Sequence, residues 1–169
     1  MPSGIDVAKK VLKRMHMTVT LSMAVRDRFG ADHHELESLF GSVLDAFEAN
    51  DREGIVQLWN EFDDRLGKHL DAEERFLIPQ VFAARPREAR TILEEHRHIR
   101  SRLVELGCRV DLHTARLVTA RGFIDDLRAH ARHEDEILYQ WADEHLPASE
   151  QRTLVAALTA PLQDRLHSA

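Results

Sequence analysis

The sequence is short of the residues that build tight turns, cross-links and membrane spans. Only seven glycines and five prolines occur among 169 residues, which argues against a β-sandwich or barrel and favours long helices. A single cysteine, Cys108, excludes an intrachain disulfide and a four-cysteine zinc site. No stretch approaches the roughly 18 apolar residues of a membrane-spanning helix, and no secretory signal is recognisable. We therefore expect a cytoplasmic protein that does not enter a membrane.

Basic residues are outnumbered as well. Lys and Arg total 23 against 29 Asp and Glu, so the formal net charge is −6 at pH 7. Nucleic-acid binding needs a basic face that contacts phosphates, and we therefore expect no nucleic-acid partner. Histidine, by contrast, is abundant at 11 residues. The placement of these histidines needs an explanation.

Four long segments carry apolar residues at the 3.6-residue period of a helix and end at stop signals. Pro79 is expected to kink or end the second segment, and Gly107 to close the third. A cap at Asp111 or Thr114 should begin the fourth, which should stop at Pro147. The expected limits are about Arg28 to Ala49, Arg52 to Leu77, Pro86 to Leu106, and from the cap at Asp111 or Thr114 to Leu146.

Short connections between long helices favour antiparallel neighbours. The predicted fold is therefore all-α, with an up-down-up-down four-helix bundle over residues 28–146. Residues 1–27 form an N-terminal extension, expected as a short amphipathic helix over 1–16 and an extended segment over 18–25. Residues 147–169 form a C-terminal tail with a short helix that Ser149 caps and Pro161 interrupts.

One histidine of each long segment falls on the apolar face of its helix when residues are placed at 100° intervals. Glu73 and Glu134 follow two of these histidines by one turn and lie on the same face, whereas Glu74 lies to the side. A single inward histidine is usually a hydrogen-bonded core residue. Two carboxylates in one narrow core, however, would repel each other and resist desolvation unless a cation lay between them. The pattern therefore predicts a metal site made of His33, His69, Glu73, His96, His130 and Glu134.

The number and type of these ligands favour a pair of ions. Residues four apart on a helix lie about 5–6 Å apart at Cβ, so each His–Glu pair can grip one ion from one side. Six ligands are too many for one zinc but suit two metals that share bridging glutamates. Nitrogen and oxygen ligands with open positions favour iron, with manganese and zinc less favoured. The open positions would take water, an oxo or hydroxo bridge, or a small exogenous ligand.

The stretches that carry these residues resemble the hemerythrin-like, or HHE cation-binding, domain. The resemblance covers about residues 28–146 and implies a non-haem di-iron centre in a four-helix bundle. Glu73 and Glu134 would bridge the irons, and the four histidines would be terminal ligands. The matching stretches are Asp32-His33 ahead of Leu36, His69 to Pro79 (HLDAEERFLIP), Glu94 to Ile99 (EEHRHI), and His130 to Trp141 (HARHEDEILYQW).

Two departures separate the chain from oxygen-carrying hemerythrins. Those proteins have a second histidine one turn after the third-helix ligand, where this chain has Arg100. Their fourth-helix carboxylate follows its histidine by five residues, whereas Glu134 follows His130 by four. The four-His, two-Glu set is similar instead to that of iron-centre repair proteins and eukaryotic iron-sensing hemerythrin domains, although the cysteine-bearing module of the repair proteins is missing. The resemblance thus implies a protein that acts on or senses O2, NO, peroxide or iron.

Three functions stay open at this stage. The first is reversible binding of a small diatomic or peroxide ligand, or of iron itself. The second is an enzyme that turns over peroxide or nitric oxide, or delivers iron for repair of iron centres; no catalytic residue is predicted. The third is a metal-free helical scaffold that binds a protein partner through its N-terminal segment.

Four further residues near the predicted site have two interpretations each. Glu37 is expected to pair with an arginine rather than to be a seventh ligand. Arg100 either contacts a bridging carboxylate or extends to solvent. Tyr139 and Trp141 could shape a gas pocket, but aromatic residues near a helix end are more often part of the core.

Overall fold

The computed structural model describes residues 24–159, and this part of the chain is helical with no strand. The all-α prediction is therefore confirmed for these residues. Two five-residue π-helical turns, η1 and η2, interrupt the second and fourth of the long helices. The elements are α2 (Val25–Ala49), α3 (Arg52–Ala72), η1 (Glu73–Leu77), α4 (Ile78–Ala84), α5 (Pro86–Asp111), α6 (Leu117–Glu134), η2 (Asp135–Tyr139), α7 (Gln140–His145) and α8 (Ala148–Thr159).

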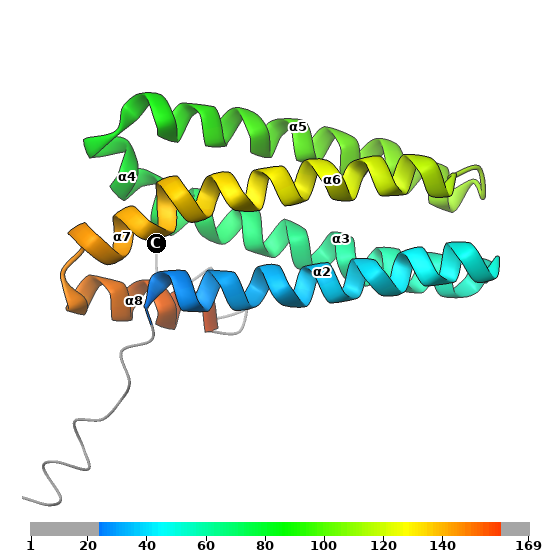
Figure 1. Cartoon of the computed structure of the whole chain (residues 1–169), viewed down its shortest axis with the longest axis horizontal. Helices are drawn as coiled ribbons and strands as arrows, with labels where there is room; N and C mark the ends of the chain where they lie inside the picture. The colour runs from blue at the N-terminus through cyan, green and yellow to red at the C-terminus, as the bar shows by residue number, and fades with distance from the viewer. Residues whose placement is uncertain (1–23, 160–169) are drawn as a thin grey trace, which may run out of the picture.

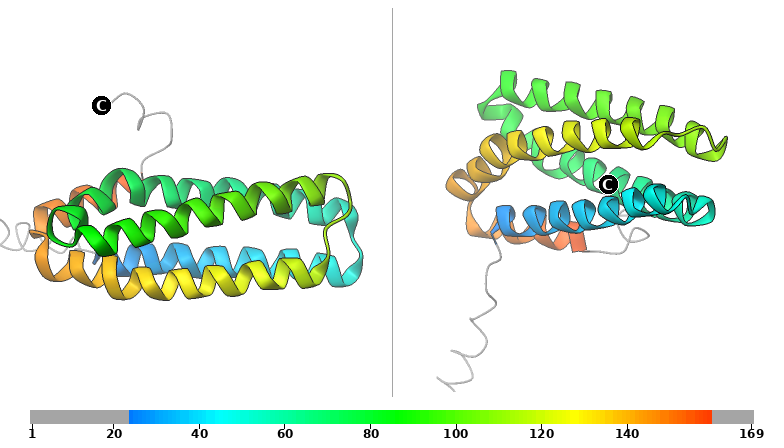
Figure 2. Two further views of the ribbon diagram at one scale, coloured as in Figure 1. Left: turned by 90° about the horizontal axis from the view of Figure 1, so that it is seen from above. Right: turned by 45° about the vertical axis from the view of Figure 1, so that its right-hand side comes forward.

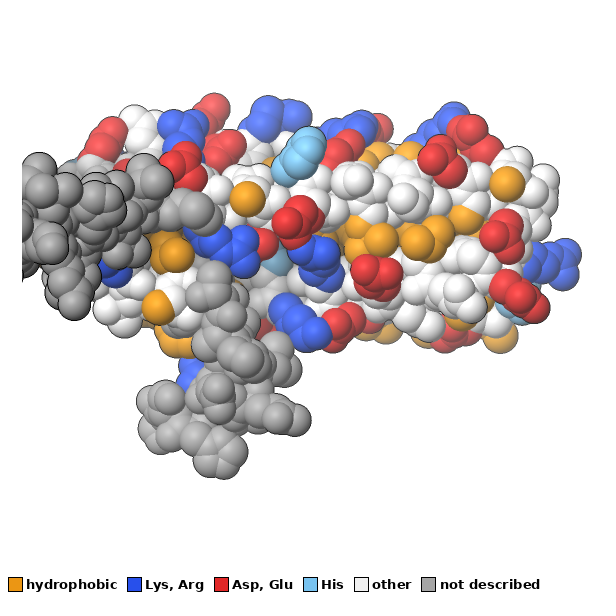
Figure 3. Space-filling model, turned by 90° about the horizontal axis from the view of Figure 1, so that it is seen from below, with side chains coloured by type: hydrophobic (Ala, Val, Ile, Leu, Met, Phe, Trp, Pro, Cys, Tyr) orange, Lys and Arg blue, Asp and Glu red, His pale blue; other side chains and the backbone are white. Residues whose placement is uncertain are grey.

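Four long rods, α2, α3, α5 and α6, lie side by side, and rods that follow each other in the chain run in opposite directions (Figures 1 and 2). The rods α2 and α5 each contact both α3 and α6, which closes the arrangement around a common interior. Helix α8 packs against α2. No described helix is long and apolar enough to cross a membrane. The face seen in Figure 3 carries acidic and basic side chains interspersed.

The connection between α2 and α3 forms as its residue types predict. Asn50 ends α2 in the left-handed conformation, with φ 53°, which asparagine tolerates better than most residues. The Asp51 carboxylate then accepts a hydrogen bond of 3.0 Å from the backbone N–H of Gly54 and caps α3. Asn50 therefore ends α2, and Asp51 begins α3.

Two expected helix ends are wrong. Helix α5 runs past Gly107 to Asp111. A Cβ at position 107 would lie 3.2 Å from Nε1 of Trp59, so this glycine permits close packing of α5 on α3 and does not end the helix. Helix α6 begins at Leu117 without a side-chain cap, so neither Asp111 nor Thr114 starts it.

The second long helix does not end at Pro79 but continues to Ala84. Its π turn η1 ends at Leu77, just before Ile78 and the proline. The N–H of Ile78 bonds to the carbonyl of Glu73. Proline has no N–H, and its ring crowds the carbonyl of the preceding turn, so a wider turn at this point lets the helix continue. The second π turn, η2, follows Glu134 directly. Both π turns therefore lie beside a predicted metal ligand.

The ends of the described chain differ slightly from expectation. Helix α2 begins at Val25, so residues 25–27 belong to it and not to the extension, and the Val25 N–H bonds to Asp143 at 2.8 Å. The short C-terminal helix is present as α8, but it begins at Ala148 and places Ser149 inside its first turn. The expected helix over 1–16, most of the segment over 18–25 and Pro161 lie outside the described residues.

The interior contains two apolar clusters. We call one the aromatic cluster, because Phe40, Trp59, Phe62 and Phe123 pack together in it. The other, the terminal cluster, includes Phe29, Leu77, Ile92, Leu138 and Trp141 and receives Leu154 from α8. Along α2, α5 and α6, the predicted metal ligands fall between residues of the two clusters in sequence. On the second rod, His69 is flanked by Leu66 and Leu70 of the aromatic cluster, and Glu73 by Ala72 and Leu77 of the terminal cluster. The bundle interior thus has a polar layer with apolar packing on both sides.

Candidate metal centre

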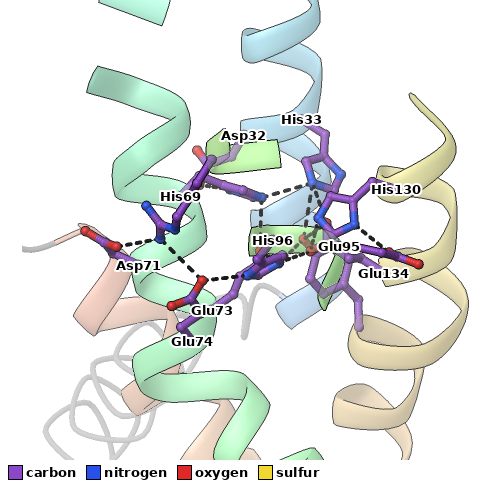
Figure 4. A network of polar contacts seen from close by, with 12 residues as sticks. Asp32, His33, His69, Asp71, Glu73, Glu74, Glu95, His96, His130 and Glu134 are labelled. Atoms are coloured by element: carbon purple, nitrogen blue, oxygen red, sulfur yellow. Dashed lines mark hydrogen bonds and ion pairs between the residues drawn. The ribbon is translucent and has the colours of Figure 1, made fainter. Parts of the chain in front are cut away.

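All six predicted ligands come together in this polar layer (Figure 4). Helix α2 contributes His33, and α5 contributes His96. The other two rods each contribute a histidine and a glutamate one turn later, from α3–η1 and from α6. Within residues 24–159, the buried polar or charged side chains are five of these six, and the side chain of His33 is 18% exposed. These residues are His69, Glu73, His96, His130 and Glu134.

Five of the six residues form two groups with the geometry of a cation site, and Glu134 belongs to both. In the first group, His33 Nε2 lies 3.0 Å from His69 Nε2 and 3.2 Å from Glu134 Oε2. In the second, Glu134 Oε1 lies 2.9 Å from His96 Nε2 and 2.8 Å from His130 Nε2. One carboxylate therefore faces the two histidine pairs with its two oxygens.

Glu73 lies beside both groups without belonging to either. Its Oε2 lies 3.5 Å from both His69 Nε2 and His96 Nε2, and it belongs to neither group. Its Oε1 accepts a hydrogen bond from the hydroxyl of Tyr139. The structure thus places Glu73 at the edge of both groups and Glu134 between them.

Several atoms in the layer lack the partners that buried polar groups normally have. Glu73 Oε2, His69 Nδ1 and His130 Nε2 are buried without a hydrogen bond; His130 Nε2 is close to Glu134 but outside hydrogen-bond geometry. In addition, His33 and His69 direct ring nitrogens at each other at 3.0 Å, where at least one nitrogen must be protonated to bond. A cation would take lone pairs from these nitrogens and oxygens, so the donor set fits a bound metal.

A second ring of carboxylates lies behind the histidines, at their Nδ1 atoms. Glu74 Oε1 lies 2.9 Å from His96 Nδ1, and Glu95 Oε2 lies 2.8 Å from His130 Nδ1. Asp32 is further from His69 Nδ1, at 3.9 Å. A carboxylate at Nδ1 holds a ligating imidazole in place and directs its Nε2 inward, as is common around protein-bound metals. The apolar periodicity does not indicate this role, because Glu74 and Glu95 lie off the apolar faces of their helices.

The pKa values of the two carboxyl groups in the layer are shifted in opposite directions. Burial and the neighbouring charge of Glu134 raise the pKa of Glu73 well above its usual value. Burial also acts to raise the pKa of Glu134, but the close imidazoles of His130, His33 and His96 outweigh it and hold that pKa well below the usual value. Burial and the two carboxylates raise the pKa of Tyr139, which keeps its phenol a donor. Without a cation, the layer thus favours the neutral form of Glu73 and the ionised form of Glu134.

The remaining residues singled out from the sequence have clear positions. Glu37 pairs with Arg128 of α6, as expected of a solvated partner. Arg100 does not reach a bridging carboxylate; it donates to Asp71 at 2.7 Å and to Glu74 at 3.3 Å. It therefore contacts the carboxylate behind His96. Trp141 is part of the terminal cluster, whereas Tyr139 is buried with its hydroxyl in the polar layer.

A cavity of about 400 Å³ lies beside the first ligand group, between α2, α3 and α6. His33, His69 and His130 contribute to its wall, and most of its other lining is apolar. Glu37 and Arg128, which pair with each other, also line it. The apolar lining residues are Leu36, Phe62, Leu66, Leu70, Ile124, Leu127 and Ala131, and His34 and Arg132 complete the wall. The cavity thus places a partly apolar space beside the imidazoles.

Comparison with known proteins agrees with this geometry. The family model described as the hemerythrin HHE cation binding domain matches residues 25–142, well over half of the chain. The matched range contains all six predicted ligands and the carboxylates behind them. A search of curated proteins and a search of solved structures gave no match.

Proposed function

The chain belongs to the hemerythrin HHE cation-binding family, and we propose that it binds two iron ions in its polar layer and through them a small ligand. The observation that carries this proposal is the position of Glu134, whose two oxygens face two separate histidine pairs. We further propose that the four rods form the up-down-up-down bundle of this family and that the protein acts in the cytoplasm. Manganese and zinc are less favoured, because open positions with nitrogen and oxygen ligands suit iron.

The roles of the residues follow from their contacts. His33 and His69 would hold one ion, His96 and His130 the other, and Glu134 would bridge them. Glu74 and Glu95 fix the rings of His96 and His130 through their Nδ1 atoms. A bound iron pair would supply the electrons and the open coordination positions that O2, NO or peroxide requires. The apolar clusters on either side exclude water from the layer.

The cavity supports a small ligand such as O2 or NO. Half of its lining residues are apolar, Glu37 and Arg128 pair with each other, and Arg132 adds a further positive charge. Apolar walls favour a ligand that loses little hydration. A neutral diatomic loses little hydration there and arrives directly at His33 and His69.

One contact favours the enzymatic alternative, turnover of peroxide or nitric oxide. Glu95 bonds both to His130 Nδ1, at 2.8 Å, and to His133 Nδ1, at 2.9 Å. The side chain of His133 is 30% exposed, so a continuous polar connection joins the layer to the surface. Reduction of peroxide consumes protons, and such a connection could deliver them. A metal-free scaffold is disfavoured, because it would gain nothing from burying these charged groups.

Rapid mixing of the reduced, iron-loaded protein with O2 and with NO tests the proposal. We expect a spectral change that saturates at one ligand per iron pair and reverses when the gas is removed. Repeated turnovers without accumulation of a bound form would favour the enzyme. Leu127→Trp, which fills the cavity, should slow the reaction and leave the iron content unchanged. Val104→Trp, at a position 69% exposed on α5, is the matched control and should react at the native rate.

A further inference from the structure

The imidazole rings of the two ligand groups are held in place to different degrees. In the group from α5 and α6, the Nδ1 atoms of His96 and His130 both contact carboxylates at 2.8–2.9 Å. In the group from α2 and α3, His69 Nδ1 is buried without a hydrogen bond. His33 is also the one ligand whose side chain is partly exposed, at 18%. The α5–α6 group is therefore prearranged for a cation, and the α2–α3 group is less so.

Tyr139 adds to this difference between the two ligand groups. It is the only tyrosine in the chain and is fully buried, with its ring stacked on Phe29 at 4.8 Å between centroids. Its hydroxyl donates to Glu73 Oε1 and lies 3.3 Å from His33 Nε2 and 3.4 Å from Glu134 Oε2. The phenol thus occupies the space beside His33 and engages Glu73, whose other oxygen lies 3.5 Å from His69 Nε2 and from His96 Nε2.

We infer that Tyr139 makes the occupation of the two positions sequential. The first cation enters at His96, His130 and Glu134, where the phenol is not in the way. The second enters at His33 and His69, and there Glu73 must exchange its hydrogen bond with Tyr139 for the cation. This inference rests on the proposed function, since it assumes that the layer binds two ions.

The exchange has a measurable consequence for affinity. The loss of this hydrogen bond weakens the second step by about tenfold relative to a site without the phenol. The first step involves Glu134 Oε1, which faces away from the phenol toward His96 and His130. Replacement of Tyr139 by phenylalanine removes the hydroxyl and keeps the ring that stacks on Phe29.

Anaerobic titration of the metal-free protein with Co(II), in competition with a chromophoric chelator, separates the two steps. We expect two equivalents to bind to the native protein, the second at least about tenfold more weakly. In Tyr139→Phe the second step should tighten by about tenfold or more, with the first unchanged. Trp141→Phe, a change in the same cluster without a hydroxyl in the site, should alter neither step.

The titration distinguishes a failure of the proposed function from a failure of the role of Tyr139. Fewer than two equivalents bound by the native protein would overturn the proposed function. Two equivalents of equal affinity, or a second step that Tyr139→Phe leaves unchanged or weakens, would overturn the role of Tyr139 alone.

A ¹⁹F label on the native protein gives a second test, which does not depend on whether a variant folds. Incorporation of 3-fluorotyrosine yields a single ¹⁹F resonance, because the chain has one tyrosine. During titration with diamagnetic Zn(II), we expect this resonance to shift mainly with the second equivalent. A shift that is complete at the first equivalent would overturn the proposed order.

Discussion

The aromatic cluster and the polar layer are built from the same four rods, yet they have opposite properties. In the cluster, Phe62 lies 4.8 Å from Phe40 and 6.4 Å from Phe123 between ring centroids, and all three are at most 1% exposed. In the layer, equally buried positions carry Glu73 and Glu134, and three buried polar atoms there lack hydrogen bonds. The cluster gains stability from burial, whereas the layer is stable only because apolar packing surrounds it.

The comparison shows how a helical rod can separate stability from function along its length. On α2, the inward positions change from Phe29 to His33 and then to Leu36 and Phe40. No change of backbone is needed, because residues three or four apart share a face. If the two regions are independent, a substitution in one should leave the other unchanged.

Glu134→Gln should have the largest effect, loss of both irons. Glu134 is the one residue common to the two ligand groups, and an amide is a far poorer metal ligand than a carboxylate. Metal analysis of protein purified from iron-supplied cells measures the change. Glu136→Gln, at an exposed position two residues away, is the control and should keep its full iron content. Retention of one iron by Glu134→Gln would mean that the groups do not share this residue.

Phe62→Ala should have the opposite signature, lower stability with unchanged iron content. Removing a buried phenylalanine costs about 3–5 kcal/mol of unfolding free energy, and the melting temperature should fall by about 10 °C. Phe62 lies in the aromatic cluster, and the variant should still bind two irons per folded chain. A proportional loss of iron would show that the cluster and the layer are coupled.

Glu74→Gln should weaken metal binding by about tenfold to a hundredfold without abolishing it. The Glu74 carboxylate holds His96 through Nδ1, and an amide holds it less firmly. Chelator competition gives the affinity. Asp71→Asn is the matched control, because Asp71 contacts Arg100 but no predicted ligand in this structure. If both variants lose the same affinity, the orientation of His96 is not the cause.

Glu73→Gln should have the smallest effect, a gain in stability of the metal-free protein that grows with pH. The pKa of Glu73 is raised in the folded state above its usual 4.5. A carboxyl group of this kind favours the folded state below the unfolded pKa and loses that contribution as pH rises through the folded pKa. Glutamine cannot ionise, so the variant should melt at the same temperature as the native protein near pH 5 and at a higher temperature than the native protein at pH 8. Parallel melting curves at all pH values would contradict the raised pKa.

Helix phase explains why so much of the site could be predicted from the sequence. The spacing of His69 to Glu73 and of His130 to Glu134 places each pair on one face of a helix, whatever the details of packing. Burial of all four followed from the apolar residues on the same faces. The all-helical fold followed from the same periodicity.

Contacts between helices could not be predicted in this way. Glu74 and Glu95 lie off the apolar faces of their own helices, and they reach histidines only because α5 packs beside α3 and α6. The role of Gly107 depends on Trp59 of another helix. Tyr139 is the last residue of the π turn η2, and a strict 100° count does not anticipate that its hydroxyl enters the layer.

The iron content and visible spectrum of the native protein, purified from iron-supplied cells, show whether the polar layer binds a pair of irons. We predict two irons per chain, with near-ultraviolet charge-transfer absorption of a coupled ferric pair in the oxidised state. One zinc per chain without iron, or a protein that holds no metal, would contradict it.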